Sequence, residues 1–388
     1  MPASRSSLGR RLVARLRGRV DRRRSGRSAA PQLVELYEVA EAWPVVATVF
    51  PEPYVFNPTG VDREIMDLDQ RWANRSIVLP PISLHDIAGA AIRASGIIQT
   101  AGGALLFESV KRPGHLLRSS ELRLRPRSII RRDGVGTTIT LADRVPNYFH
   151  WLIDMVPRLY ALEQRGGPIT LVVPRDAPAF VDALVERVVT DAVTIERCPR
   201  GIAMAFDSVR LSPFTTVWSH GLLRPEIVTW LRTRLVGSPE VRPPGSGRRI
   251  FIQRRGTRAR TIENEEEVLR ALRPFNLEPV RPELLPLAEQ LDLFVHAELI
   301  VGPCGAGLTN MIAADRAAVV DINPGGRNGM PFHPSFWSLA HSCGHRYVVV
   351  PHAAHLHTPS YVVDAARVRA AVEVALDSSP GRAPAAIV

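Results

Sequence analysis

The chain has 388 residues, 45% of them apolar, and a formal net charge of +11. A chain of this length is expected to fold as two domains. The positive charge is concentrated in residues 1–30, which hold ten arginines and one acidic residue, so the rest of the chain carries only +2. Nucleic-acid-binding proteins more often carry positive charge on the folded surface, and we therefore expect no nucleic-acid partner.

The cysteines and the hydropathy pattern predict a cytoplasmic protein. Cys198, Cys304 and Cys343 are odd in number, widely spaced and without a C-x-x-C pair, as in proteins of a reducing compartment. No apolar run reaches the roughly 18 residues of a transmembrane helix, and the N-terminus has no apolar core of signal-peptide length.

Residues 1–30 form a basic arm that is compatible with two structures. Leu8, Leu12, Leu16 and Val20 recur every four residues between arginines. This spacing suits a short amphipathic helix on an anionic membrane surface, which would make the protein peripheral on the inner face of the plasma membrane. The composition favours the alternative, a disordered and solvated tail.

Residues 31–236 are expected to form a first α/β domain. Short apolar segments broken by Pro and Gly predict strands at Ser76–Pro81, Gly96–Thr100, Ala104–Glu108 and Gly134–Leu141. Helices then alternate with strands, the helices near 148–165, 177–189 and 225–236 and the strands near 169–173, 192–196 and 208–212. This alternation predicts a parallel sheet with helices on both faces. Asp67-Leu68-Asp69 matches a metal-binding D-x-D pattern but lies in a helical-looking stretch, so we interpret it as a chance match.

Residues 237–247 have the composition of a linker, and a second α/β domain is expected at 248–360, with a C-terminal helix and tail at 361–388. Its predicted strands are Ile250–Gln253, Leu277–Val280, Leu299–Val301 and Ala318–Ile322, and its predicted helices are Asn264–Leu272, Leu287–Ala297 and Ala306–Ala314. Ligands of such folds bind outside the carboxyl ends of the strands, so each loop after a strand is a candidate site.

Two of these loops have the chemistry of a phosphate site. Gly305-Ala306-Gly307 leads from a strand into a predicted helix, whose free N–H groups and dipole favour an anion; a turn that serves packing is the alternative. Thr309 and Asn310 add a hydroxyl and an amide. Gln253–Arg260 holds four arginines after a strand, and arginine binds phosphate oxygens bidentately, although a solvated charge run has the same composition.

The segment 147–158 is a third candidate. Asn147 can cap a helix on which His150, Asp154 and Arg158 share its face, while Pro157 is expected to kink that helix. A His and an Asp on a polar stripe suit a general base, or else a pair that braces two domains. Six histidines lie between 333 and 357, but His341, Cys343 and His345 match no standard zinc spacing, so we expect acceptor binding or surface placement and no metal.

Taken together, these motifs resemble glycosyltransferase family 61, the DUF563-type proteins similar to capsular-polysaccharide biosynthesis enzymes. The matching pieces, in the family's order, are Asn147–Asp154 with Pro157-Arg158, Phe251–Arg255 with Ile262–Glu265, Glu289-Gln290, and Gly302–Asn310 followed by Val320–Pro324. The resemblance implies a GT-B architecture, two Rossmann-like domains with a cleft between them, the first on the acceptor side and the second holding the donor.

The resemblance also implies roles for individual residues. It implies inverting transfer from a nucleotide-sugar without a cofactor or an obligatory metal, with Asp154 as the first choice of base and His150 as the second. Arg254 and Arg255 would stabilise the departing diphosphate, to which Cys304, Gly305, Ala306, Gly307, Leu308, Thr309 and Asn310 would present their backbone. Asp321 or Asn323 would reach the ribose or base, and Asn147, Trp151 and Arg158 would line the acceptor side. The family usually has His where Cys304 stands, and a thiol is a poor hydrogen-bond donor.

The sequence therefore predicts a bacterial hexosyl- or pentosyltransferase that uses a glycan or lipid-linked acceptor in surface-polysaccharide biosynthesis. Two alternatives remain open at this point. One is a nucleotide-sugar-binding or scaffold protein of polysaccharide assembly that has lost turnover at Cys304, and the other is nucleic-acid binding through the arm.

Overall fold

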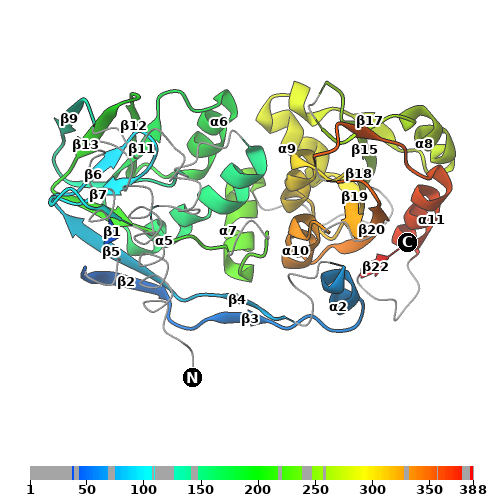
Figure 1. Ribbon diagram of the computed structural model, residues 1–388, viewed down its shortest axis with the longest axis horizontal. Coiled ribbons are helices and arrows are strands. Elements are labelled where there is room, and N and C mark those ends of the chain that lie inside the picture. The colour runs from blue at the N-terminus through cyan, green and yellow to red at the C-terminus, as the bar shows by residue number, and fades with distance from the viewer. Residues whose placement is uncertain are drawn as a thin grey trace, which may run out of the picture. The chain divides into compact units, whose positions relative to one another are not determined.

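The computed structural model describes residues 37–38, 43–68, 75–106, 109, 126–140, 147–216, 221–237, 247–256, 259–326, 332–355, 357–377 and 385–387. The chain divides into two compact units, the first made of residues 1–53 and 80–215 and the second of residues 54–79 and 216–388 (Figure 1). The predicted arm and most of the predicted linker lie outside the described residues. The chain enters the second unit at residue 216, before α7 (Pro225–Val236), rather than after this helix.

The first unit contains two six-stranded sheets. One has the order β12 (Val193–Cys198), β11 (Ile169–Pro174), β10 (Val135–Thr137), β14 (Ser208–Leu211), β5 (Ile82–Ala88) and β2 (Val45–Phe50). Its first four strands are parallel, and β5 and β2 are antiparallel additions. The other has the order β1 (Tyr37–Glu38), β8 (Leu105–Leu106), β7 (Ile98–Gln99), β6 (Ala91–Arg93), β13 (Ile202–Ala205) and β9 (Ser128–Arg131).

The core of this unit lies where the two sheets meet. Ile87, Val172 and Leu211 come from the first sheet and pack in one cluster with Ile92 and Met204 from the second. Helix α6 (Ala179–Val188) buries Val181, Leu184, Val185 and Val188, the helical spacing of one apolar face. The predicted helix near 148–165 is divided, as Pro157 suggested, into a π-helical turn, η3 (His150–Met155), and α5 (Arg158–Arg165).

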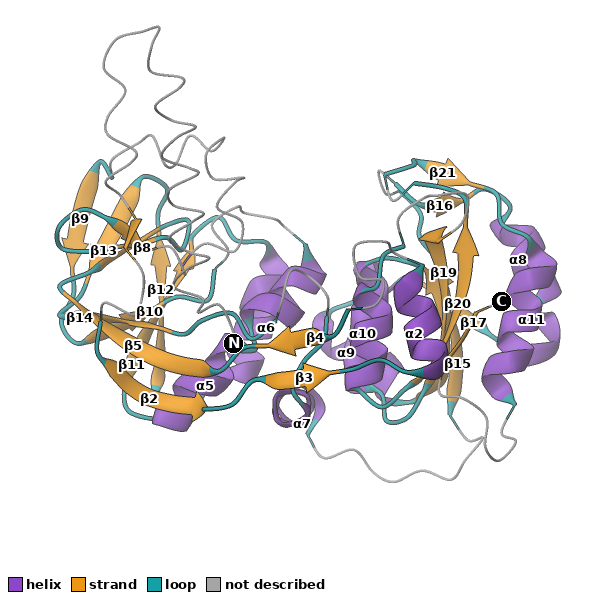
Figure 2. Cartoon of the chain, turned by 60° about the horizontal axis from the view of Figure 1, so that its bottom comes forward, coloured by secondary structure: helices purple, strands orange, loops and turns teal. Residues whose placement is uncertain are grey.

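The second unit is built on one parallel sheet. Its order is β17 (Glu278–Val280), β15 (Arg248–Ile252), β18 (Ala297–Pro303), β19 (Ala318–Gly326), β20 (Arg346–His352) and β22 (Ala385–Ile387). Helices α8 (Glu265–Ala271) and α11 (Ala365–Leu376) cover one face, and α9 (Leu287–Val295) and α10 (Ser335–Ser342) cover the other (Figures 1 and 2). The buried residues Leu299, Ile300 and Val301 form the apolar run expected of a strand covered on both faces.

A segment from the early part of the sequence, residues 54–79, belongs to the second unit. It forms β3 (Tyr54–Phe56), α2 (Gly60–Asp67) and β4 (Ile77–Leu79). Trp337 donates its indole N–H to Asp62 at 2.8 Å, and the ring of Phe56 lies 4.2 Å from that of His341. Asp67 ends a helix, as expected, while Asp69 lies outside the described residues. The sequence predicted a strand at Ser76–Pro81, but neither β3, with which β4 pairs, nor that this segment belongs to the second unit.

The prediction of an α/β fold is confirmed. One expected helix was wrong in type, because Ala306–Ala313 forms a 3-10 helix, η6, in which the Leu308 N–H bonds Gly305 O at 2.9 Å. Six consecutive residues of η6, Leu308 to Ala313, are buried. Within the described residues, no helix is both long and apolar enough to span a membrane.

Candidate functional site

Both parallel sheets have a point where the strand order reverses, and polar residues gather at each. In the second unit the chain passes from β15 to β17 on one side and then to β18 on the other. The reversal therefore lies between β15 and β18, whose carboxyl ends carry Arg254 and Gly305. Ligands of doubly wound sheets bind at this position.

Arg254 lies directly against Gly305. A Cβ placed on Gly305 would stand 2.4 Å from Arg254 Nη1, so only glycine leaves room for the guanidinium. The Nε of Arg254 donates to Ala259 O at 2.8 Å, and within the described residues this is its one hydrogen bond. The two Nη groups of a half-buried arginine are thus left for a ligand. Burial, and then the neighbouring charge of Arg260, lowers the pKa of Arg254, which an anion would offset.

Arg260 is bonded to the backbone of this turn. Its Nη1 donates to Cys304 O at 2.8 Å and lies 4.0 Å from Cys304 Sγ, while its Nε has no partner among the described residues. The sequence run had included Arg260 without singling it out. Arg260 also has a backbone φ of 67°, which is rare for a residue other than glycine.

Cys304 does not face the ligand side of this turn. Its side chain is fully buried, and burial raises the pKa of the thiol well above its ordinary value. The charge of Asp321 raises that pKa further, while Arg260 opposes the shift. A side chain at position 304 therefore contributes to an interior polar cluster rather than to a phosphate contact.

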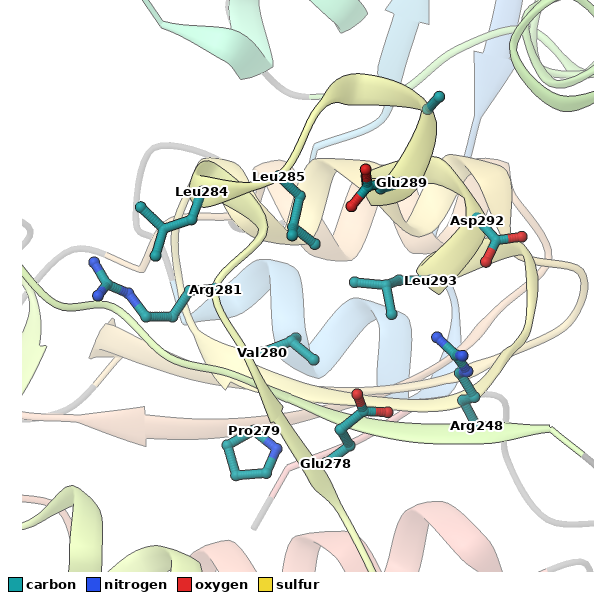
Figure 3. A pocket seen from close by; sticks show the side chains of 11 residues that line it. Arg248, Glu278, Pro279, Val280, Arg281, Leu284, Leu285, Glu289, Asp292 and Leu293 are labelled. Carbon is teal, nitrogen blue, oxygen red and sulfur yellow. The ribbon is translucent and has the colours of Figure 1, made fainter.

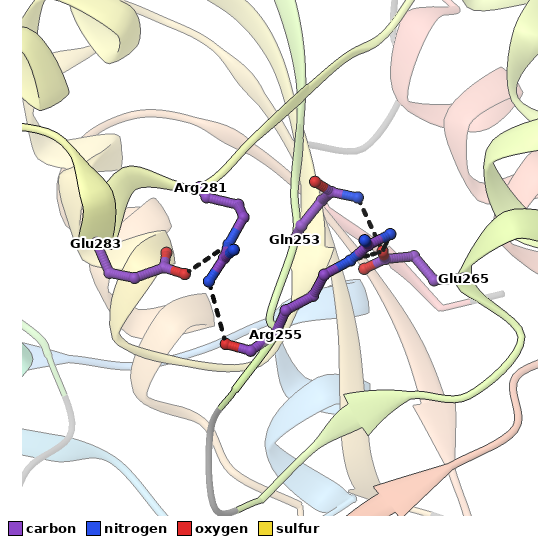
Figure 4. Close-up of polar contacts among 5 residues, drawn as sticks. All are labelled: Gln253, Arg255, Glu265, Arg281 and Glu283. Carbon is purple, nitrogen blue, oxygen red and sulfur yellow. Dashed lines mark hydrogen bonds and ion pairs between the residues drawn. The ribbon is translucent and has the colours of Figure 1, made fainter.

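Arg255 points away from Arg254, as neighbours in an extended chain do. It donates from Nε and Nη2 to Glu265 Oε1 at 3.0 and 2.8 Å, and Gln253 donates to the same oxygen at 2.8 Å (Figure 4). Arg281 bonds Glu283 and, at 3.5 Å, Arg255 O. Arg255 thus fastens the start of α8 to the end of β15, which makes Arg254 the better anion ligand.

Asp321 and Asn323 are fully buried within β19, which continues to Gly326 and not only to Ile322 as predicted. Asp321 Oδ2 accepts hydrogen bonds from Asn323 Nδ2 at 2.8 Å and from the Tyr347 hydroxyl at 2.7 Å. Burial raises the pKa of Asp321 to about 6, an effect that these two hydrogen bonds oppose. Figure 2 shows β16 (Thr261–Ile262) and β21 (Ser360–Tyr361) beyond the carboxyl ends of β19 and β20. This burial argues against direct contact with a ribose or base.

The residues after Gly305 divide into an accessible and a buried part. Ala306 and Gly307 are partly exposed, and the first N–H groups of a helix have no acceptor within it. Leu308, Thr309 and Asn310 are buried, and Asn310 donates to Gln290 Oε1 at 3.1 Å. We therefore take residues 305–307 together with Arg254 as the candidate anion site.

In the first unit the strand order reverses between β10 and β14, and the helix that follows β10 carries a His–Asp pair. His150 Nδ1 lies 2.6 Å from Asp154 Oδ2, and Asn147 caps the preceding turn by accepting the Phe149 N–H at 2.9 Å. The side chain of Asp154 is fully buried, whereas that of His150 is 16% exposed. The π-helical turn carries both, and such turns are frequent at functional sites.

Arg158 and Trp151 are buried beside this pair. Arg158 Nε donates to Ser212 O at 2.8 Å, Ser212 Oγ donates back to Arg158 O at 2.9 Å, and the guanidinium lies 4.7 Å from the Phe214 ring centroid. Burial lowers the pKa of Arg158 to about 9. The Arg158 side chain holds α5 against the end of β14, and Trp151 is buried, so neither is presented to solvent.

A groove of about 700 Å³ runs along β17 and α9 (Figure 3). Arg248 lies at one end and Arg281 at the other, with Leu284, Leu285 and Leu293 between them. Pro279 in the edge strand has no N–H, which prevents another strand from adding there. The groove includes neither Arg254 nor Gly305, and no pattern in the sequence predicted it.

The three residues considered as metal ligands point to separate partners. His341 faces Asp62 and the Phe56 ring, Cys343 is buried, and His345 bonds Met311 O and the Ala317 N–H. In the part of the chain that the structure describes, no three His, Cys, Asp or Glu side chains gather as metal ligands would.

The sequence matches the family described as Glycosyltransferase 61 over residues 148–320. No curated protein matches the chain. The matched region begins just before the His150–Asp154 turn and includes Arg254, Gly305 and Asn310. It therefore covers the strand-order reversal of the second unit, whereas β10 of the first unit lies before it. Residues 148–320, somewhat less than half of the chain, are therefore similar to the glycosyltransferase 61 family, a name that implies a sugar donor and an acceptor.

Proposed function

We propose that this protein is an inverting glycosyltransferase that binds the diphosphate of a nucleotide-sugar at Arg254 and residues 305–307. The observation that carries this is the free guanidinium of Arg254 against Gly305, at the strand-order reversal of the second unit. Arginine nitrogens and helix-start N–H groups are the donors that phosphate oxygens prefer. Similarity to the glycosyltransferase 61 family over residues 148–320 suggests the class of ligand.

His150 is the better general base, with Asp154 as its positioning partner. A carboxylate only accepts, so the neutral His150 ring donates its Nδ1–H to Asp154 and keeps Nε2 free for a proton. As the acceptor oxygen bonds the anomeric carbon, its proton passes to Nε2 and the carbon–phosphate oxygen bond breaks. The electron pair leaves on the diphosphate, where Arg254 stabilises it.

Further parts of this proposal rest on the resemblance and the sequence. They are a GT-B arrangement of the two units, transfer without a metal, and a glycan or lipid-linked acceptor of surface-polysaccharide synthesis. The basic arm would hold the cytoplasmic enzyme on the inner membrane face. The non-catalytic alternative rested on Cys304, and the burial of this side chain removes its main support.

The experiment that tests the proposal measures release of nucleoside diphosphate from a panel of nucleotide-sugars. The wild-type protein is expected to turn over one of them. His150→Ala should lower the rate by about 10²–10⁴-fold, the usual contribution of a general base. His85→Ala, a histidine of the same unit on β5, is the matched control and should retain the wild-type rate. Wild-type rates in His150→Ala would exclude His150 as the base.

A further inference from the structure

A loop with several histidines, between β20 and β21, is linked to the proposed diphosphate site at Arg254 and residues 305–307. Arg260 links the two, because its N–H donates to Thr358 O at 2.8 Å and its Nη1 donates to Cys304 O at 2.8 Å. Tyr361 makes a second link. Its hydroxyl donates at 3.4 Å to Ile322 O, which also accepts the Cys304 N–H at 3.0 Å.

His352, the last residue of β20, lies on the outer side of Tyr361. The centroids of the two rings are 4.9 Å apart. Tyr361 is buried and His352 is partly exposed, so a single aromatic ring separates this histidine from the interior polar cluster beneath Gly305. In the sheet order β20 is two places from β18, which separates their ends by about 10 Å. A nucleoside attached to a diphosphate at Gly305 has the length to cover this separation.

The hydrogen bonds of the loop fix which ring nitrogen carries the proton. His352 Nδ1 lies 3.1 Å from the Ala354 N–H, and His355 Nδ1 lies 3.1 Å from the His357 N–H. A backbone N–H can only donate, so both Nδ1 atoms accept, and each neutral ring carries its hydrogen on Nε2. Nε2 lies across the ring from Nδ1, and each ring therefore presents a donor away from the loop backbone.

We propose that this loop is the nucleoside subsite of the donor site and that His352 is its specificity-determining residue. The inference rests on the proposed function, because it needs the diphosphate at Arg254. His352 Nε2–H would donate to a carbonyl or hydroxyl oxygen of the nucleoside, and the ring would provide a stacking surface. This loop takes the role that the sequence had given to Asp321 and Asn323, whose side chains are buried.

The test compares the binding of inorganic pyrophosphate with that of uridine, guanosine, cytidine, thymidine and adenosine diphosphates, by calorimetry on the full chain. The wild type should bind one nucleoside diphosphate more tightly than pyrophosphate. His352→Ala should weaken that nucleoside diphosphate about tenfold and change pyrophosphate less than about twofold, since only the nucleoside loses a contact. His352→Phe keeps an aromatic ring against Tyr361 and removes the N–H. This variant is expected to fold and to lose part of the affinity for the nucleoside diphosphate.

The matched control is His296→Ala. His296 precedes β18 at the amino end of the strands of the same sheet, and its Nδ1 lies 2.8 Å from Asp292 O. Both affinities should therefore stay at the wild-type values. Equal losses of both ligands in His352→Ala, or no loss of either, would overturn the inference. So would a wild type that binds pyrophosphate as tightly as every nucleoside diphosphate. If the wild type bound neither class of ligand, or if Arg254→Ala bound both with wild-type affinity, the proposed diphosphate site itself would be contradicted.

Discussion

Replacing Gly305 with alanine should weaken diphosphate binding while leaving the fold almost intact. The new Cβ would stand 2.4 Å from Arg254 Nη1, whereas ordinary contact begins at 3.4 Å, so the guanidinium must move by about 1 Å or more. The backbone can accept the methyl group, because Gly305 has an extended φ of 176°. The nearest atom is the far end of a flexible side chain, so unfolding should cost nearly the same free energy as in the wild type.

The expected loss of affinity follows from the donors that Arg254 would offer. A hydrogen bond to a charged group is worth about 1.5–3 kcal/mol, and losing one weakens binding roughly 10- to 150-fold. Calorimetry with a nucleoside diphosphate measures this loss, and urea unfolding measures stability. The matched control is Gly102→Ala in the first unit, whose Cβ would lie 3.9 Å from Thr100 Oγ1, an ordinary contact outside the proposed site.

A double-mutant cycle gives the sharpest refutation. Gly305→Ala and Arg254→Ala remove the same guanidinium from the same position, so the double variant should bind no more weakly than Arg254→Ala alone. Additive losses would show that the methyl group blocks the ligand by another route. Wild-type affinity in Gly305→Ala would show that Arg254 does not bind the diphosphate.

Three further predictions concern single side chains. Arg255→Ala should keep wild-type affinity for the diphosphate, because this side chain binds Glu265; a calorimetric loss comparable with that of Arg254→Ala would contradict this. Cys304→Ser should change that affinity less than about twofold, since a buried side chain makes no ligand contact, and a tenfold loss would refute the assignment. Burial lowers the pKa of His345 to about 4 from 6.5, so the native state binds fewer protons than the unfolded state between these values. Stability should therefore fall as the pH drops from 6.5 to 4, by up to about 3 kcal/mol, and His345→Gln should lose less in urea unfolding; equal losses would exclude His345 as the cause.

Local patterns in the sequence predicted the elements and the His–Asp pair. The spacing of four residues placed His150 beside Asp154, and Pro157 ended the turn. The π-helical geometry was not predictable, because its i to i+5 bond, from Val156 N to Trp151 O at 2.9 Å, depends on how the buried turn packs. The choice of His150 over Asp154 as the proposed general base also depends on their side-chain burial, which a periodic sequence pattern does not give.

Tertiary contacts decided the rest of the site. Adjacent arginines look alike in sequence, yet Arg254 lies against Gly305 while Arg255 reaches Glu265, ten residues further on. Asp321 was predicted to lie near the end of a strand, but β19 continues to Gly326 and Asp321 is buried within it, where the Tyr347 hydroxyl of β20 donates to its carboxylate. The local sequence of residues 54–79 did not indicate that they belong to the second unit, because the pattern of a strand does not show which segment it will pair with.

The structure of the full chain with a bound nucleoside diphosphate is the most direct test of the proposed donor site. The terminal phosphate is expected within hydrogen-bond distance of Arg254 Nη1 or Nη2 and of the backbone at residues 305–307. A phosphate bound elsewhere, for example at Arg281 in the groove along β17, with Arg254 still free, would contradict the proposed function.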